Sequence, residues 1–506
     1  MPADPSPQAE SRDAVDVLIV GAGPTGLTLA VDLARRGVRS LIVEAADRPF
    51  TGSRGLSLQP RTQEAFDDLG VMDALREAGS PLLPMQTWRN GCRAGEWRLV
   101  ERDPQAPVSR YPVQWLMPQW RTQQILQDRL LALGGAVEYG TRLTALRQSD
   151  QQVHAEVTQT DGSRRTLTAA YLVGADGGRS TVREALGITM KTEGGPLHAA
   201  VVADVRLDGL DREHWHMWPD GPGGELLLCP LPGTDQFQLT APVGDEDSDP
   251  CPQRIRELIA TRTHLPPTAV TDVQWTSYYK PRTALAERFR DKRVFLAGDA
   301  AHVHPPGGGQ GLNIGVHDAY NLGWKLGQVL HSNAPDTLLD SYDAERRPAA
   351  HDVLDLSAQL YRLGRKPEGS RERARHRNRL TLLSVHYRDS PLSTEAREQL
   401  TPTILQAGDR APDLAYTPAD ADAAAHDTPR QLFELLTGPH FTLLAVDSTP
   451  PPVPPTVRTL QVTGGALAQA LGMGLFLIRP DGHIGLATHN RAHLERYYTK
   501  VGLAAD

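Results

Sequence analysis

The sequence contains little cysteine. Its 506 residues include three cysteines, Cys92, Cys229 and Cys251, and no two of them form a Cys-x-x-Cys pair. This spacing argues against a zinc ribbon, a thioredoxin-type redox pair and a disulfide-stabilised scaffold. Such cysteine usage is typical of a reducing compartment, and we therefore expect the protein in the cytoplasm.

Long basic runs and long apolar runs are also missing. Lys and Arg number 53 against 61 Asp and Glu, a formal charge of −8, which argues against nucleic acid or an anionic membrane as partner. No apolar run approaches the roughly 20 residues that span a bilayer. Residues 1–14 lack the basic and apolar segments of a signal peptide, and we expect them to be disordered.

Residues 15–43 predict a β-α-β unit. The β-branched run 15–20 is typical of a buried strand, the apolar spacing over 24–36 indicates a helix that ends at Gly37, and 40–43 is a second strand. Such a unit opens a doubly wound parallel sheet, so we expect an α/β fold. The short runs 171–175 and 294–297 predict further strands of that sheet.

Two later segments of the chain have a different pattern of apolar, glycine and proline residues. Between 190 and 280, strand-like runs alternate with Gly and Pro turns, which predicts an inserted antiparallel sheet. Helices are expected over 123–133, 317–331 and 342–363. From about residue 401 the pattern changes again and predicts a small separate α/β domain, with the stiff proline-rich connector 449–455 inside it.

The first chemical motif is Gly21-Ala-Gly23-Pro-Thr-Gly26, which follows a predicted strand and opens a helix. Gly21 permits the tight turn, Gly23 lets a pyrophosphate approach the backbone, and Gly26 lets helix and strand pack closely. Glu44 ends the next strand, 18 residues after Gly26, where a carboxylate can bind an adenosine ribose. The motif indicates a dinucleotide but does not separate FAD from NAD.

The second motif favours FAD. Gly298-Asp299 follows the strand 294–297, and a glycine-rich turn then leads to Asn313 and a helix. A carboxylate at the end of a buried strand can bind the hydroxyls of a ribityl chain, and the backbone amides of 308–313 can face the edge of a flavin ring.

Together these motifs resemble the class A flavoprotein aromatic hydroxylases of the para-hydroxybenzoate hydroxylase superfamily. The resemblance spans residues 15–360. It is also carried by the segment Gly174-Ala-Asp176-Gly-Gly-Arg-Ser180 with Arg183, and by Arg346-Arg347-Pro348, which matches a further signature of the family. From 401 the chain resembles the thioredoxin-like C-terminal domain of the phenol and polyketide hydroxylase branch. That segment has no cysteine, so we expect it to support packing or dimerisation and not thiol chemistry.

The resemblance implies four parts and a set of FAD contacts. The parts are the N-terminus 1–14, an FAD-binding domain over 15–189 and 281–400 with a helical extension, a substrate-binding domain over 190–280, and the thioredoxin-like domain 401–506. The implied FAD contacts are Gly21, Gly23, Pro24, Thr25, Gly26, Glu44, Arg54, Gln119, Arg121, Asp176, Asp299, Pro305, Gly311, Leu312 and Asn313. Arg54 is expected near the phosphates or the flavin, Arg121 is an alternative to Gln119, and Asp176 is implicated in binding both FAD and NAD(P)H. A solvated surface role stays open for both arginines.

The implied reaction is monooxygenation. NAD(P)H would reduce FAD, O₂ would give a flavin C4a-hydroperoxide, and one oxygen atom would pass to an aromatic carbon of a phenol or polyketide. No nucleophile elbow occurs, and His302-Val-His304 lacks a third ligand, so we expect no metal site. The alternatives are Baeyer–Villiger or epoxidising chemistry on a polyketide, and a flavin-binding partner protein without turnover. We expect a monomer or a homodimer.

The sequence indicates the substrate-binding residues less clearly than the cofactor-binding residues. On a strand, alternation would place His214, His216 and Trp218 on one face. A histidine there could deprotonate a phenol, which makes His216 a candidate catalytic residue together with Arg54. The alternative is a histidine on the solvent face of the sheet, and no catalytic base is assigned.

Overall fold

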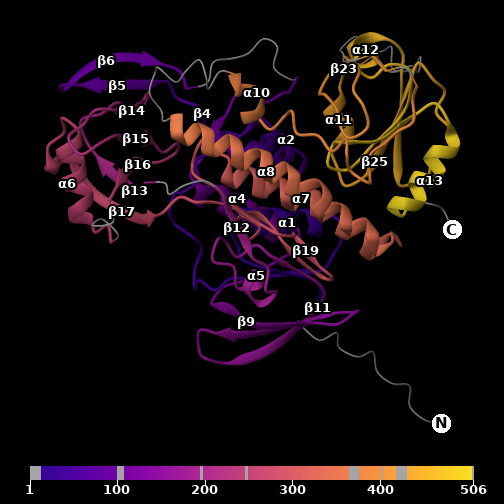
Figure 1. Ribbon diagram of the computed structural model, residues 1–506, viewed down its shortest axis with the longest axis horizontal. Helices are drawn as coiled ribbons and strands as arrows, with labels where there is room; N and C mark the ends of the chain where they lie inside the picture. The colour runs from indigo at the N-terminus through magenta and orange to yellow at the C-terminus, as the bar shows by residue number, and fades with distance from the viewer. Residues whose placement is uncertain are drawn as a thin grey trace.

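The computed structural model describes residues 13–99, 108–193, 198–244, 249–363, 375–398, 400–401, 403–416 and 430–503 (Figure 1). The expected disordered N-terminus therefore lies outside the described residues, except for Asp13 and Ala14. Two long helices cross the middle of the molecule, with one sheet on their left and the C-terminal sheet on their right (Figure 1). Among the described residues no helix is both long enough and apolar enough to cross a bilayer.

The sheet that begins the chain confirms the predicted β-α-β unit. β1 pairs in parallel with β2 on one side and with β11 on the other, and β11 pairs with β20. Helix α1 connects β1 to β2, and the strands are apolar because both faces are covered. The strands are β1 (Ala14–Val20), β2 (Ser40–Val43), β8 (Val137–Glu138), β9 (Thr141–Gln148), β10 (Val153–Gln159), β11 (Arg164–Gly174), β19 (Arg290–Asp291) and β20 (Val294–Leu296).

Eight α-helices of the described residues lie before the C-terminal sheet and outside the seven-stranded sheet, and the loops of the candidate site begin or end at several of them. They are α1 (Pro24–Arg35), α2 (Pro60–Asp68), α3 (Met72–Ala78), α4 (Gln119–Ala132), α5 (Thr181–Ala185), α7 (Gly311–His331), α8 (Asp340–Leu363) and α10 (Arg377–Leu380). α4 begins four residues and α7 six residues before the expected starts. The added residues of α4 include one apolar residue, Trp120, and those of α7 include Gly311 and Gly315, whose helix propensity is low. Short strands between them form two three-stranded sheets: β3 (Ser57–Leu58), β4 (Ser80–Pro81) and β7 (Trp115–Leu116), and β12 (Met190–Glu193), β18 (Thr283–Ala286) and β21 (His302–Val303).

A seven-stranded sheet follows the order β17-β13-β16-β15-β14-β5-β6. Its strands are β5 (Met85–Arg89), β6 (Cys92–Trp97), β13 (Ala199–Leu207), β14 (Trp215–Trp218), β15 (Leu226–Pro230), β16 (Gln236–Val243) and β17 (Val270–Tyr279). The expected antiparallel sheet is present, but it extends beyond 190–280. β5 pairs in parallel with β14, so a hairpin from the segment expected in the FAD-binding domain completes the sheet.

The two faces of this sheet have different neighbours. One face packs on α6 (Pro252–Arg262) through a core that includes Ala203, Leu228 and Phe237. The other face contributes Met217 and Leu227 to a second core that contains Leu56, from the loop before β3. The second face is therefore the one turned toward the first sheet and its loops.

The C-terminal sheet is five-stranded, in the order β22-β28-β27-β25-β26. Its strands are β22 (Thr394–Glu395), β25 (Phe441–Val446), β26 (Val457–Val462), β27 (Gly474–Ile478) and β28 (Ile484–Thr488), with helices α11 (Leu432–Leu436), α12 (Gly465–Leu471) and α13 (Arg491–Val501) and the small hairpin β23 (Ala415–Tyr416) and β24 (Arg430–Gln431). Trp324 of α7 lies in its core, with its ring centroid 5.6 Å from that of Phe441. The sheet therefore packs directly on the long helices.

Candidate functional site

The glycine-rich turn between β1 and α1 has the geometry that its sequence predicts. Gly21 has φ +108°, and a Cβ there would lie 2.4 Å from the Ala175 carbonyl oxygen. A Cβ on Gly26 would lie 2.0 Å from the Gly21 oxygen, whereas a Cβ on Gly23 would meet no atom within 4 Å. The turn therefore needs glycine at positions 21 and 26 for its own packing. Open space remains beside Gly23, which directly precedes Pro24, the first residue of α1.

Glu44 reaches this turn from the end of β2. One carboxylate oxygen accepts a hydrogen bond from the Ala22 N–H at 2.9 Å, and the other accepts one from the Ala46 N–H at 2.8 Å. Gln123 of α4 donates to the Ala22 carbonyl at 3.1 Å. The spacing that predicted Glu44 beside the turn is thus confirmed, and α4 supports the same loop.

Close packing between α1 and α7 brings the two chemical motifs together. Gly298 has φ +61°, and a Cβ there would lie 2.6 Å from the Thr25 Oγ1; a Cβ on Gly315 would lie 2.4 Å from the same atom. Asp299 follows Gly298 in a short 3-10 turn (Gly298–Ala300), and its side chain is exposed. An exposed carboxylate thus lies one residue from the contact with the glycine-rich turn.

The turn into α7 is held by the side chain of Asn313. Its Oδ1 accepts from the Gln59 N–H at 2.8 Å, and its Nδ2 donates to the carbonyls of Ser57 and Gly309, each at 2.8 Å. This amide is fully used inside the protein, so a ligand contact at this residue would have to come from its backbone. Gly311 and Leu312 are half-buried, and Pro305 is buried.

The loop before β3 connects the cofactor motifs to the seven-stranded sheet. The Gly55 N–H donates to Gln119 Oε1 at 2.9 Å, and Arg54 Nη2 donates to Ser277 Oγ on β17 at 2.8 Å. Arg54 is exposed. Arg121 donates to Gln124 on its own helix at 2.8 Å. Of the two expected contacts on α4, Gln119 therefore touches this loop, while Arg121 contacts its own helix.

Asp176 organises the turn after β11. It accepts hydrogen bonds from the Ser180 hydroxyl and from the Val182 N–H, at the start of α5. Burial raises the pKa of Asp176, and these hydrogen bonds act in the opposite direction. Arg183 donates to the carbonyls of Ala300 and Gly178 at 2.9 and 3.1 Å. The Asp176 segment is thereby tied to the Asp299 turn.

His216 lies on the face of the seven-stranded sheet that packs on α6. Its side chain is fully buried; Nδ1 accepts from Trp88 Nε1 at 3.1 Å, and Nε2 lies 2.9 Å from the Asp211 carbonyl. Burial lowers the pKa of His216. The expected alternative of a solvent-facing histidine is wrong, because the strand is covered on both faces. Trp218 shares this inner core.

On the opposite face, Asp204 is a buried acid that the sequence analysis missed. Its side chain is 1% exposed, and Ser53 lies next to it, although within the described residues neither its oxygens nor the Ser53 hydroxyl makes a hydrogen bond of regular geometry. Burial raises the pKa of Asp204 to about 7, with Ser53 acting in the opposite direction. A lone acid inside an apolar strand is the only sequence signal for it.

His302 contacts a buried carboxylate. Its Nε2 lies 2.6 Å from Oδ2 of Asp318, a fully buried carboxylate on α7 that the sequence analysis did not single out. A charged residue on the buried stripe of a predicted helix is the signal that could have found Asp318. No group of three metal-ligating side chains occurs within the described part of the chain.

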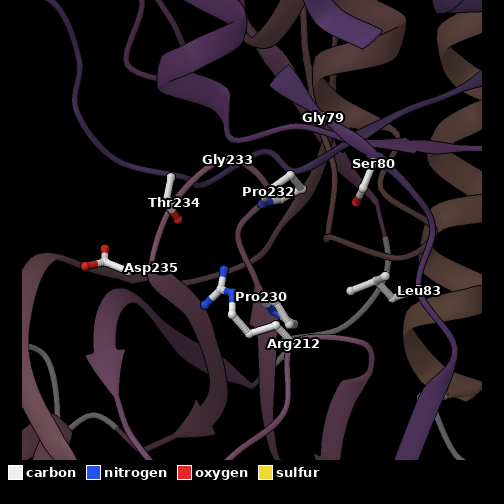
Figure 2. Close-up of a pocket in the computed structure, with 9 residues that line it drawn as sticks. All are labelled: Gly79, Ser80, Leu83, Arg212, Pro230, Pro232, Gly233, Thr234 and Asp235. Carbon is white, nitrogen blue, oxygen red and sulfur yellow. The ribbon is translucent and has the colours of Figure 1, made fainter. Parts of the chain in front are cut away.

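A pocket of about 560 Å³ opens at one end of the inner strands of the seven-stranded sheet, between β4 and the turn from β15 to β16. Figure 2 shows its lining, with the Arg212 side chain between Pro230 and Thr234. None of the expected FAD contacts lines it. The pocket is therefore separate from the arrangement built around the glycine-rich turn.

The chain matches known flavoproteins over most of its length. A family model described as an FAD binding domain matches residues 14–357. The chain is 39% identical over 492 residues to a flavin-dependent monooxygenase of Mycobacteroides abscessus, with 96% of this chain and 99% of that protein covered. It is 34% identical over 525 residues to 6-methylpretetramide 4-monooxygenase of Streptomyces rimosus, with 93% and 90% covered.

A solved structure extends the similarity to the complete fold. The ternary complex of aklavinone-11 hydroxylase with FAD and aklavinone superposes with a TM-score of 0.78 at 28% identity, covering 97% of this chain and 99% of that one.

Proposed function

Because the chain belongs to the FAD-dependent monooxygenases of aromatic and polyketide compounds, we propose that it uses NAD(P)H and O₂ to hydroxylate a phenolic or polyketide ring. One oxygen atom of O₂ would enter a C–H bond of the ring, and the other would leave as water. NAD(P)H and a proton would supply the two electrons and the hydrogen that this balance requires. Bound FAD would supply the chemistry that passes electrons from NAD(P)H to O₂.

The observation that carries this proposal is the contact of Thr25 with Gly298, which joins the two cofactor motifs. The open space at Gly23 and the N-terminus of α1 suit a pyrophosphate. Glu44 would bind the adenosine ribose, and the exposed Asp299 would bind the ribityl hydroxyls. The residues present therefore fit FAD, with Asn313 contributing through its backbone.

We assign the substrate to the face of the seven-stranded sheet turned toward Arg54. The loop that carries Arg54 contacts Gln119 through Gly55, and Arg54 donates to Ser277 on β17 of this sheet. The apolar core around Leu56 would exclude water from that side. His216 lies on the other face, so it would act only on the fold. The C-terminal sheet would be the thioredoxin-like domain, serving packing and not thiol chemistry, since residues 401–506 contain no cysteine.

The test is substrate-dependent turnover. Purified protein is expected to be yellow and to oxidise NAD(P)H and consume O₂ only with a hydroxylated aromatic compound from a panel of phenols and polyketide quinones. The product is expected to carry one oxygen atom from labelled O₂ on an aromatic carbon. Lactone or epoxide formation would refute hydroxylation, and a yellow protein without substrate-dependent oxidation would refute the enzyme assignment.

A further inference from the structure

One buried carboxylate holds both ends of the turn that carries Asp299. The Oδ2 atom of Asp318 accepts a hydrogen bond from the Gly298 N–H at 2.9 Å and lies 2.6 Å from His302 Nε2. Burial alone would raise the pKa of Asp318, but His302 and Arg346 hold it below its usual range. The carboxylate is therefore charged, and Asp299 lies between the two residues that it binds.

Arg346 of α8 fixes this carboxylate from behind. Its side chain is fully buried, and its Nε donates to Asp318 Oδ1 at 2.8 Å. Its Nη2 donates to the Ile314 carbonyl, in the first turn of α7, at 3.3 Å. Its Nη1 donates to the Tyr387 hydroxyl at 2.9 Å. One guanidinium thus connects the Asp299 turn, the start of α7 and Tyr387.

Tyr387 in turn contacts the C-terminal sheet. Its ring centroid lies 4.3 Å from that of His483, in the turn between β27 and β28. His483 is 4% exposed, so this turn is buried in the main body. The Tyr320 hydroxyl of α7 donates to Asp68 at 2.6 Å, and its oxygen lies 3.1 Å from the Pro480 carbonyl of the same turn. Arg479 of the same turn donates to Glu345 of α8 at 2.6 Å, so the turn 479–483 packs against both α7 and α8.

We propose that Arg346 and Asp318 are positioning residues for FAD, and that the turn 479–483 of the C-terminal sheet supports them through Tyr387. This inference rests on the FAD site described under Proposed function. A buried guanidinium that loses one acceptor keeps an unsatisfied N–H, which is costly in an apolar interior. Arg346 would shift to recover a partner, and Asp318 and the Asp299 turn would move with it.

The sharpest test removes one hydroxyl. Tyr387→Phe takes away the Arg346 acceptor and leaves the ring on His483. The matched control is Tyr497→Phe on α13: Tyr497 is also buried, and its hydroxyl donates to the Leu392 carbonyl at 2.8 Å without contacting Arg346. His483→Leu removes the ring contact from the C-terminal side. The measurements are the FAD dissociation constant and the flavin absorption spectrum of the holoenzyme, together with the midpoint of denaturant unfolding.

We expect Tyr387→Phe and His483→Leu to raise the FAD dissociation constant about 3- to 30-fold and to change the flavin spectrum. Tyr497→Phe should lower the unfolding midpoint similarly with no change in FAD affinity. If all three variants lose stability but bind FAD as tightly as the wild type, the contacts are only structural and the proposal is wrong. A wild-type protein that binds no FAD would refute the cofactor site itself.

Discussion

Replacing Arg479 with methionine should strongly destabilise the protein, because Arg479 belongs to a buried and charge-balanced group of four residues. Its Nη1 and Nη2 donate to the two Glu345 oxygens at 2.6 and 2.9 Å, and its Nε donates to Asp481 at 3.1 Å. Lys325 Nζ donates to Glu345 at 2.8 Å. All four side chains are at most 3% exposed, and they carry two positive and two negative charges.

The size of the loss follows from the charge that is left behind. Without Arg479, Asp481 and Glu345 share one cation, Lys325, and one buried negative charge is uncompensated. Removing one partner of a buried ion pair typically costs about 3–5 kcal/mol. The typical free energy of unfolding of a domain is about 5–15 kcal/mol, so the variant should lose a large part of its stability.

The assay is denaturant unfolding at pH 7, followed by fluorescence. The control is Arg206→Met, which breaks the exposed pairs with Asp235 and Asp272; the Arg206 and Asp235 side chains are 43% and 67% exposed. This variant should cost far less than Arg479→Met, because exposed pairs are screened by water. In Arg479→Met, adding Asp481→Asn removes the excess charge and should recover part of the loss. If Arg479→Met costs no more than the control, the reasoning from buried charge is refuted.

Three further predictions concern the site. Gly23→Val should fold, since a Cβ there meets no atom within 4 Å, but should lose FAD; normal flavin stoichiometry would contradict the pyrophosphate assignment. Asp299→Ala should weaken FAD binding by about 1.5–3 kcal/mol with an unchanged unfolding midpoint, and equilibrium titration of the apoprotein tests this. Asp204→Asn should stabilise the protein by at most about 4 kcal/mol at pH 8 and little at pH 4. The native pKa of about 7 lies above the usual value of 3.8. The contribution of Asp204 to the stability of the wild type is therefore highest below pH 3.8, falls as the pH rises from there, and has reached its lower level once the pH has passed through 7; unfolding curves at pH 4 and pH 8 test this.

Local chemistry determined much of this protein from its sequence. The strand–turn–helix at Gly21–Gly26 and the placement of Glu44 depend on steric rules that act over a few residues, and both predictions are confirmed. The glycine-rich turn indicated a dinucleotide. The FAD cofactor and the monooxygenase family were predicted from the resemblance of several motifs to a known family, and the comparisons with known proteins confirm both. The change of pattern from about residue 401 predicted a small α/β domain there, and a five-stranded sheet is present, but its strand β22 lies before residue 401, in the segment expected in the FAD-binding domain.

Contacts between distant segments were decided only by the tertiary structure. β5 pairs with β14 through residues that are 130 positions apart in the sequence, such as Met85 and Trp215. Alternation along β14 does not say which face of the sheet each side chain joins, so the orientation of His216 could not be predicted from the sequence. Asp318 and Arg346 resemble ordinary charged helix residues until the fold buries them against His302 and Tyr387. A buried charge is tolerated only where partners from several elements converge, and that convergence is a property of the packed chain and not of any local pattern.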